Sequence, residues 1–356
     1  MLGDHELRTL PGSATQNVNP SPRDRGEGQG SEGELSSSVI IDALVVPITR
    51  AALAKQVGDY RAAMGARAFG TKKSGAALHE LLLARVRAKV GSRARLLIVP
   101  DDSLWELPFH TLVDRRGRYV IDDAVVAYAP SLATLREMTA LARRRASEPA
   151  AVEILAVGDP SPAEGPRVPH AAREVNALAS IYGPSRSRVY VGTRADEARF
   201  REQAGQARRI HIAAHGVLDS RAPLHSYVAL APGAAGDDGL LEARELMRQR
   251  LRAELLVLSA CETARGRIGA GEGLIGLGWA AFLAGSASTI VSQWKVDSRS
   301  TADLMIAFHR ALQPDASGRR PGTADALRRA ALATARTPAY AHPFYWAGFV
   351  AIGDPR

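Results

Sequence analysis

Two short apolar runs, each ending abruptly in small and polar residues, stand out in the hydrophobic pattern of the chain. Residues 209–216 read RIHIAAHG, and residues 254–263 read ELLVLSACET. Apolar runs of this length, bounded by turn-forming residues, are typical of buried strands. The carboxyl ends of neighbouring parallel strands meet at one edge of a sheet, about 4.8 Å apart. We therefore expect His215 and Cys261, which end these two runs, to lie within hydrogen-bonding reach of each other.

Strand-like and helix-like segments alternate through the rest of residues 149–356, which predicts an α/β fold with mostly parallel strands flanked by helices. Thr193 is the expected N-cap of one helix, and Gly285 is the expected end of another. The other strands are expected at 153–158, 188–191, 227–230, 287–292 and 345–352, and the helices at 171–181, 195–206, 242–248, 272–284, 299–312 and 322–336.

Residues 39–148 contain strand and helix patterns but no His–Cys pair, so we interpret them as a non-catalytic α/β lobe. The expected strands are 39–47, 95–100, 104–112, 119–121 and 124–128, and the expected helices are 76–90 and a segment that Ser131 caps and that runs to about residue 145. Residues 1–38 are rich in Ser, Gly and Pro and have no apolar segment. We expect them to form a disordered tail without a secretory signal.

The composition narrows the class of protein. The 356 residues carry a formal net charge of +9, yet only five of the 46 basic residues are lysines. A basic excess is one sign of nucleic-acid binding, but the arginines are scattered, and aromatic residues make up only 5%, too few for stacking platforms. We therefore do not expect a nucleic-acid partner. The single cysteine excludes an intramolecular disulfide and indicates a cytoplasmic setting. Glycines interrupt the uncharged stretch between Glu272 and Lys295, so we do not expect a membrane helix.

A cysteine beside a histidine suits nucleophilic catalysis. The thiolate is the nucleophile, and a nearby imidazole takes its proton or lowers the thiol pKa. Gly216 would let a substrate carbonyl approach the backbone, and the N–H groups of Gly216 and Cys261 could hold the oxyanion. The alternative is that Cys261 is a small buried filler of the strand and His215 a core histidine, because cysteine is among the most buried residue types.

Five stretches in a fixed order resemble the CHAT family of caspase-like cysteine peptidases, which is related to separase. They are HIAAHG, DGLLEARELM, LLVLSACETARG, GEGLIGLGWAAFLAGSASTIVSQWKV and HPFYWAGFVAIG. The resemblance covers most of residues 39–356. It implies a caspase-like fold, hydrolysis of peptide bonds in a protein substrate, and a catalytic dyad of His215 and Cys261. The caspase pentapeptide around the cysteine is absent, so aspartate specificity is not implied.

The resemblance also implies a substrate-binding residue. In relatives, acidic groups near the segment Trp294–Ser298 hold a basic side chain of the substrate. Asp297 could serve in this way here, and the alternative is that it is a solvated aspartate of a loop. Ser298 stands where the family pattern carries an acidic residue. This departure from the pattern argues against specificity for basic residues. Asp219 and Glu262 flank the dyad, and either of them could orient His215.

The resulting prediction is a cysteine endopeptidase without cofactor or metal, kept latent until a partner protein activates it. The glycine-rich residues 264–273 are a candidate order–disorder switch, and the alternative is an ordinary surface loop with two solvated arginines. A non-catalytic interaction module with the same fold is the main alternative. Two patterns are discounted. The GxGxxG at 271–276 does not follow a strand directly. His211 and His215 would lie about 13 Å apart on a strand, too far to share a zinc ion.

Overall fold

The computed structural model describes residues 41–90, 94–162, 166–219, 221–233, 237–260 and 272–355. The chain divides into two units, residues 1–47 and 48–356. Residues 41–47 of the first unit form neither helix nor strand. The strand expected at 39–47 is therefore absent from its described part, because an apolar run becomes a strand only where another strand pairs with it.

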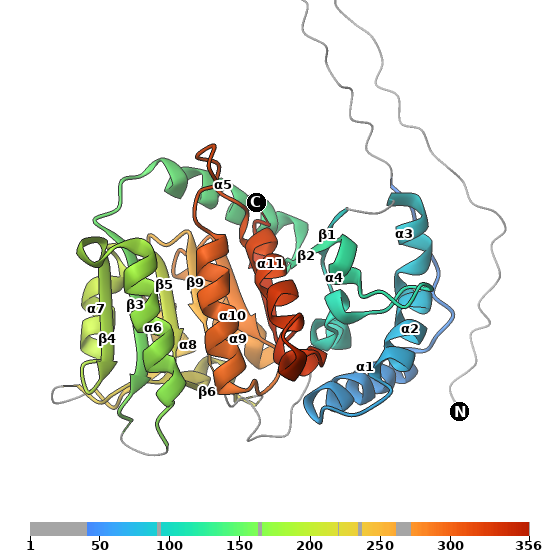
Figure 1. The fold of residues 1–356 in the computed structure, drawn as a ribbon, viewed down its shortest axis with the longest axis horizontal. Helices are drawn as coiled ribbons and strands as arrows, with labels where there is room; N and C mark the ends of the chain where they lie inside the picture. Colours follow the sequence, from blue (N-terminus) through green and yellow to red (C-terminus); the bar gives the residue numbers. More distant parts are fainter. Residues whose placement is uncertain are drawn as a thin grey trace, which may run out of the picture. The chain divides into compact units, whose positions relative to one another are not determined.

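The second unit is built on an eight-stranded sheet (Figure 1). Its order is β1 (Arg95–Ile98), β2 (Val125–Tyr128), β11 (Phe349–Gly353), β10 (Ser288–Ser292), β9 (Leu255–Leu258), β5 (Ala207–Ala213), β3 (Val152–Pro160) and β4 (Ser187–Gly192). All neighbouring pairs are parallel except β10 and β11. The predicted class, an α/β sheet of mostly parallel strands flanked by helices, is confirmed.

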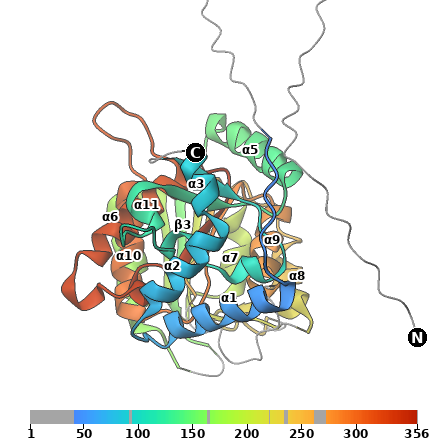
Figure 2. The same cartoon turned by 90° about the vertical axis from the view of Figure 1, so that its right-hand side faces the viewer.

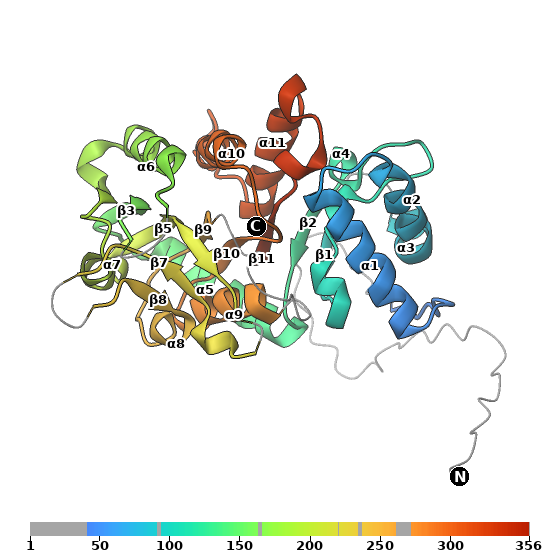
Figure 3. The same ribbon diagram turned by 90° about the horizontal axis from the view of Figure 1, so that it is seen from below.

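Helices cover both faces of this sheet, which explains why its central strands are continuous apolar runs. Leu255 and Val257 of β9 pack with one buried cluster, and Leu256 and Leu258 pack with another, because successive side chains point to opposite faces. Figure 3 shows the two helical layers. One holds α6 (Pro169–Tyr182), α10 (Ser298–Ala311) and α11 (Thr323–Ala335); the other holds α5 (Leu132–Ser147), α7 (Glu197–Ala204), α8 (Ala243–Leu246) and α9 (Glu272–Leu283).

The elements before β3 join the same sheet and core. Strands β1 and β2 extend the sheet beyond β11, and α1 (Arg50–Gly65), α2 (Thr71–Leu82) and α3 (Ala84–Val90) lie beside them (Figure 3). Figure 2 shows these three helices from their own side. Val57 and Tyr60 of α1 belong to the same buried cluster as Leu256 of β9. The predicted boundary at 148/149 stays a prediction, but the sheet and the core continue across it.

Three expectations in this N-terminal part are wrong. Residues 104–112 form two 3₁₀ turns, Asp102–Glu106 and Phe109–Thr111, on either side of Pro108, which cannot donate to a strand ladder. Residues 119–121 lead into the short helix α4 (Val120–Asp123), because the Asp122 carboxylate accepts the backbone N–H of Tyr119 at 2.9 Å. The helix expected at 76–90 is two helices, α2 and α3.

Most of the expected helix ends agree with the structure. Ser131 caps α5, and its Oγ accepts the N–H of Thr134 at 3.0 Å. Gly285 follows α9 with φ 109°, a conformation that favours glycine. The cap of α7 is Asp196 rather than Thr193, because its carboxylate accepts the N–H of Arg199 at 2.8 Å. Within the described ranges, no helix has the length and apolarity needed to cross a membrane.

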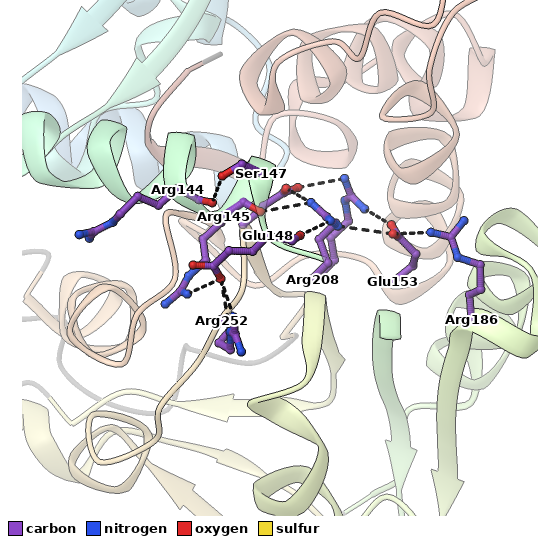
Figure 4. Close-up of polar contacts among 10 residues, drawn as sticks. Arg144, Arg145, Ser147, Glu148, Glu153, Arg186, Arg208 and Arg252 are labelled. Atoms are coloured by element: carbon purple, nitrogen blue, oxygen red, sulfur yellow. Dashed lines mark hydrogen bonds and ion pairs between the residues drawn. The ribbon is translucent and has the colours of Figure 1, made fainter. Parts of the chain in front are cut away.

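Charged side chains hold the amino ends of the central strands. Arg208 of β5 donates to the carbonyl of Glu148 at 2.8 Å and lies 3.4 Å from Glu153 of β3 (Figure 4). Arg252 pairs with Glu148 at 3.0 Å. These contacts fasten the connection between α5 and β3 to the sheet, at the edge opposite to the one where β5 and β9 end.

Candidate active site

The two runs that the sequence singled out are neighbouring parallel strands. β5 pairs with β9, and Ile212 lies opposite Leu258. One more backbone hydrogen bond, from Ser259 N–H to the Ile212 carbonyl at 2.8 Å, continues this pairing past β9. The carboxyl ends of the two strands therefore lie next to each other, as the sequence predicted.

His215 lies just beyond β5 rather than at its tip. The chain turns at Ala214, and His215 begins β6 (His215–Val217), which pairs antiparallel with β7 (Tyr227–Ala229). β8 (Leu240–Glu242) completes this small three-stranded sheet. The buried methyl groups of Ala213 and Ala214 leave room for the turn. The expectation that His215 ends the buried strand is therefore wrong by one short turn.

The His215 ring is oriented by a backbone carbonyl. Its Nε2 lies 2.7 Å from the carbonyl oxygen of Pro166, in the loop between β3 and α6. A carbonyl oxygen only accepts, so Nε2 donates the proton in this bond. In the neutral ring, Nδ1 is then the basic nitrogen. The half-buried imidazole thus has the tautomer of a general base whose Nδ1 accepts a proton.

Gly216 brings this segment against the end of β9. A Cβ at position 216 would lie 3.0 Å from the Cβ of Ala260, so only glycine allows this approach without displacement. Ala260 is 6% exposed, and its carbonyl accepts a hydrogen bond from Ser292 Oγ of β10 at 3.2 Å. The backbone at His215 and Gly216 therefore packs beside the residue that directly precedes Cys261.

Cys261 itself lies outside the described residues, as do Glu262 and the switch segment up to residue 271. The dyad, the oxyanion role of the Gly216 and Cys261 N–H groups, and the switch at 264–273 therefore remain predictions. Two polar atoms at this edge have no hydrogen-bond partner within the described ranges: Ser259 Oγ and Gln293 Oε1. Buried polar atoms without partners are few in proteins, and each of them calls for an explanation.

Asp297 is the residue before α10 and has a structural role. Its carboxylate accepts the N–H of Ser300 at 2.9 Å and caps the helix. It also lines a surface hollow of about 680 Å³ together with Asp303, Tyr340 and Tyr345. His215 and Gly216 do not line this hollow. The substrate-binding role of Asp297 stays a prediction.

Asp219 and His211 also have identified partners. The Asp219 carboxylate accepts the N–H groups of Ala222 and Arg221 at 3.0 and 2.8 Å, and these bonds lower its pKa. His211 is fully buried; its Nε2 lies 2.7 Å from Glu174 of α6, and its Nδ1 lies 3.0 Å from His309 of α10. Burial lowers the pKa of His309 well below its usual value. His211 thus holds α6 and α10 to the sheet, in agreement with a structural role.

Sequence reasoning missed the contribution of Pro166 and Ser292. Pro166 acts through a backbone carbonyl, which leaves no signature beyond the Pro- and Gly-rich character of the loop. No three His, Cys, Asp or Glu side chains gather as a metal site in the part of the chain that the structure describes.

The family follows from comparison with known sequences. The CHAT domain model matches residues 72–354, so the chain belongs to the CHAT domain family and the resemblance is confirmed. Mouse tetratricopeptide repeat protein 28 is 33% identical over 115 residues, which are 32% of this chain and 4% of that protein. The chain thus matches only a small part of that relative's length.

Two solved structures are similar at low identity. The separase–securin complex of Saccharomyces cerevisiae has a TM-score of 0.46 at 14% identity, over 72% of this chain and 15% of that chain. The Arg-specific cysteine proteinase gingipain R has a TM-score of 0.46 at 10% identity, over 87% of this chain and 68% of that chain.

Proposed function

We propose that this chain is a cysteine endopeptidase in which His215 is the general base and Cys261 the nucleophile. The observation that carries the proposal is the packing of Gly216 against Ala260, which brings the His215 segment to the residue before the only cysteine of the chain. The hydrogen bond from His215 Nε2 to the Pro166 carbonyl supports it, because it leaves Nδ1 as the basic nitrogen. Membership of the CHAT domain family supports it further.

The proposed reaction has two stages. His215 Nδ1 takes the thiol proton, and the Cys261 thiolate attacks the scissile carbonyl carbon. The N–H groups of Gly216 and Cys261 stabilise the oxyanion of the tetrahedral intermediate. The protonated imidazole then gives its proton to the leaving amine, and a thioester remains. Water hydrolyses the thioester, releases the acid and restores the thiol.

The proposed substrate is a protein, and Asp297 is the proposed contact for a basic side chain. The hollow beside Asp297 is also lined by Arg299 and by Asp303, whose carboxylate pairs with Arg173 at 2.7 Å, so the proposed contact rests on Asp297 alone. We further propose that a protein partner activates the chain and that it acts in the cytoplasm, the compartment indicated by the single cysteine.

A digest of a fluorescent peptide library tests the proposal. Wild type, Cys261→Ala and His215→Ala would be compared, with His225→Ala as the matched control, because His225 is an exposed histidine paired with Glu242. We expect kcat/KM to fall at least about 1,000-fold in the two dyad variants, with unchanged melting temperatures, and to stay at the wild-type value in the control.

Residual hydrolysis in purified Cys261→Ala that equals the wild type would contradict the nucleophile. A wild type that cleaves nothing in the library, alone or with cell extract as a source of activator, would favour the non-catalytic interaction module.

A further inference from the structure

An arginine of α1 with little exposed surface reaches the end of β10. Arg61 donates twice to the backbone carbonyl of Gln293, from Nε at 3.1 Å and from the second terminal nitrogen at 2.8 Å. Its remaining terminal nitrogen pairs with Glu106 at 3.0 Å. The side chains of Arg61 and Glu106 are 12% and 14% exposed. All of the guanidinium nitrogens are thus engaged, and Arg61 precedes the residues 72–354 that define the family match.

Gln293 directly follows β10 and is held mainly from the N-terminal part of the chain. Arg61 binds its carbonyl, and the carbonyl of Trp105 accepts its side-chain amide at 3.0 Å. Its own N–H donates to the carbonyl of Gly348 at 2.7 Å. Gln293 is 2% exposed, so its position is fixed on three sides.

The end of β10 is in turn bonded to the candidate active site. Ser292, the residue before Gln293, donates its Oγ proton to the carbonyl of Ala260 at 3.2 Å. Ala260 packs against Gly216, the residue after His215. A continuous series of contacts therefore runs from α1 through Gln293 and Ser292 to the backbone on which the proposed dyad rests.

We propose that Arg61 is a positioning residue for the peptidase site: it fixes the carboxyl end of β10, and thereby Ala260, at the distance from His215 that the reaction requires. The inference rests on the proposed function. An ion pair with little exposed surface is weak evidence for a contribution to stability. A planar guanidinium that donates two hydrogen bonds to one carbonyl does, however, fix the orientation of that carbonyl. Lysine cannot make this forked contact, because its single ammonium group lacks the fixed geometry.

The test compares variants of α1 in the full chain. Arg61→Met keeps the bulk of the stem and removes every hydrogen bond, and Arg61→Lys keeps the charge but loses the fork. Lys55→Ala is the matched control on the same helix, because Lys55 is exposed and its ion pair among the described residues is with its helix neighbour Asp59, at 2.6 Å. Three quantities are measured: kcat and KM for a cleaved peptide, the rate of Cys261 alkylation by iodoacetamide, and the melting temperature.

We expect Arg61→Met to lower kcat about 10- to 100-fold with KM within about twofold, because small displacements of reacting groups have effects of this size. Arg61→Lys should fall between Arg61→Met and the wild type, and Lys55→Ala should match the wild type. The alkylation rate should change with the same ranking, because thiol reactivity follows the environment of the thiolate.

Folded Arg61→Met with wild-type kcat and a wild-type alkylation rate would overturn the inference and leave the peptidase proposal intact. A loss of kcat that only follows the unfolded fraction at the assay temperature would also overturn it. If the wild type hydrolyses nothing, alone or with cell extract as a source of activator, the peptidase proposal fails, and the alkylation rates alone decide the positioning role. If Arg61→Met does not fold, Arg61→Lys, which loses the fork, carries the test; a wild-type kcat and alkylation rate in that folded variant would contradict the inference.

Discussion

The two ends of the central strands are built from opposite kinds of residue. At the amino ends, Arg209 of β5 lies 2.9 Å from Glu153 of β3 and 3.2 Å from Glu254, the residue before β9. At the carboxyl ends, Gly216, Ser259 and Ala260 carry neither charge nor bulk, and Gly216 and Ala260 are in close contact. Strands β5 and β9 therefore have ion pairs at their amino ends and closely packed small residues at their carboxyl ends.

This difference separates stability from the proposed chemistry. Ion pairs at the amino edge hold α5 and the strands together (Figure 4). Small residues at the carboxyl edge let segments from distant parts of the sequence approach one another, and ligands of open α/β sheets bind at this edge. Substitutions at the amino edge should therefore lower stability and leave turnover unchanged. Substitutions at the carboxyl edge should mainly lower turnover.

The largest effect on stability is expected for Glu153→Gln at the amino edge. Glu153 is 6% exposed and accepts hydrogen bonds from Arg209 at 2.9 Å and Arg186 at 2.5 Å. Glutamine removes the charge that faces Arg209 and Arg186, while Arg209 keeps its contact with Glu254, so the free energy of unfolding should fall by about 3 kcal/mol, the upper end for hydrogen bonds to charged groups. Urea unfolding measures the loss, and kcat of the folded protein should not change.

Glu148→Gln is the matched control for this substitution. Glu148 belongs to the same set of ion pairs, but its side chain is 33% exposed, and the side chain of its partner Arg252 is 56% exposed. Its loss should be clearly smaller, because solvent screens exposed pairs. Equal losses for the two variants, or a lower kcat in folded Glu153→Gln, would remove the distinction between the edges.

A smaller effect on stability is expected when the pH is lowered, because of a buried histidine at the carboxyl side of the sheet. His110 is buried, its Nε2 lies 2.9 Å from the carbonyl of Ala347 near the start of β11, and burial lowers its pKa from 6.5 to about 4. As the pH falls below 6.5, His110 takes up a proton in the unfolded chain, whereas in the folded chain it takes up this proton only near pH 4. The stability that His110 contributes is therefore complete above pH 6.5 and is lost as the pH falls to 4, by up to about 3 kcal/mol.

Urea unfolding at pH 7.5 and pH 4.5 checks this titration. His110→Gln keeps an amide donor for the Ala347 carbonyl but does not titrate, so its stability should fall less than that of the wild type over this interval. Other groups titrate equally in both proteins and cancel in the difference. Identical pH dependence of the two proteins would mean that His110 charges readily in the folded state.

The central strands were predictable because their signal is local. The run at 255–258 is wholly apolar, the run at 209–213 is apolar at 210, 212 and 213, and small residues follow both. The rule that parallel strands end at one edge places His215 beside Ala260. The prediction for residues 104–112 was wrong because their apolar residues resemble those of a strand. Pro108 favours 3₁₀ turns instead, and so does the hydroxyl of Tyr128, which bonds to the Phe109 N–H and the Leu107 carbonyl.

The supporting contacts of the site were not predictable, because they join residues far apart in sequence through backbone atoms. Arg61 and Gln293 are 232 residues apart, and His215 and Pro166 are 49 apart. The acceptor in both cases is a main-chain carbonyl, which every residue possesses. Helix α1 was missed because it buries only Val57, Tyr60 and Met64 along its 16 residues, too few for a clear apolar stripe.

The smallest effect concerns Asp297, the acidic exception at the carboxyl side of β10. Its carboxylate caps α10, so Asp297→Ala should lower the free energy of unfolding by about 1 kcal/mol, whereas Asp297→Ser, which keeps a capping oxygen, should be close to the wild type. If the carboxylate also receives a basic side chain, both variants should lose preference for Lys or Arg over Leu at the cleavage site, by about tenfold in kcat/KM. Paired peptides that differ only at this position measure the preference. Wild-type preference in Asp297→Ser, with equal losses on both peptides in Asp297→Ala, would show that Asp297 only caps the helix and that the carboxyl edge recognises its substrate without this charge.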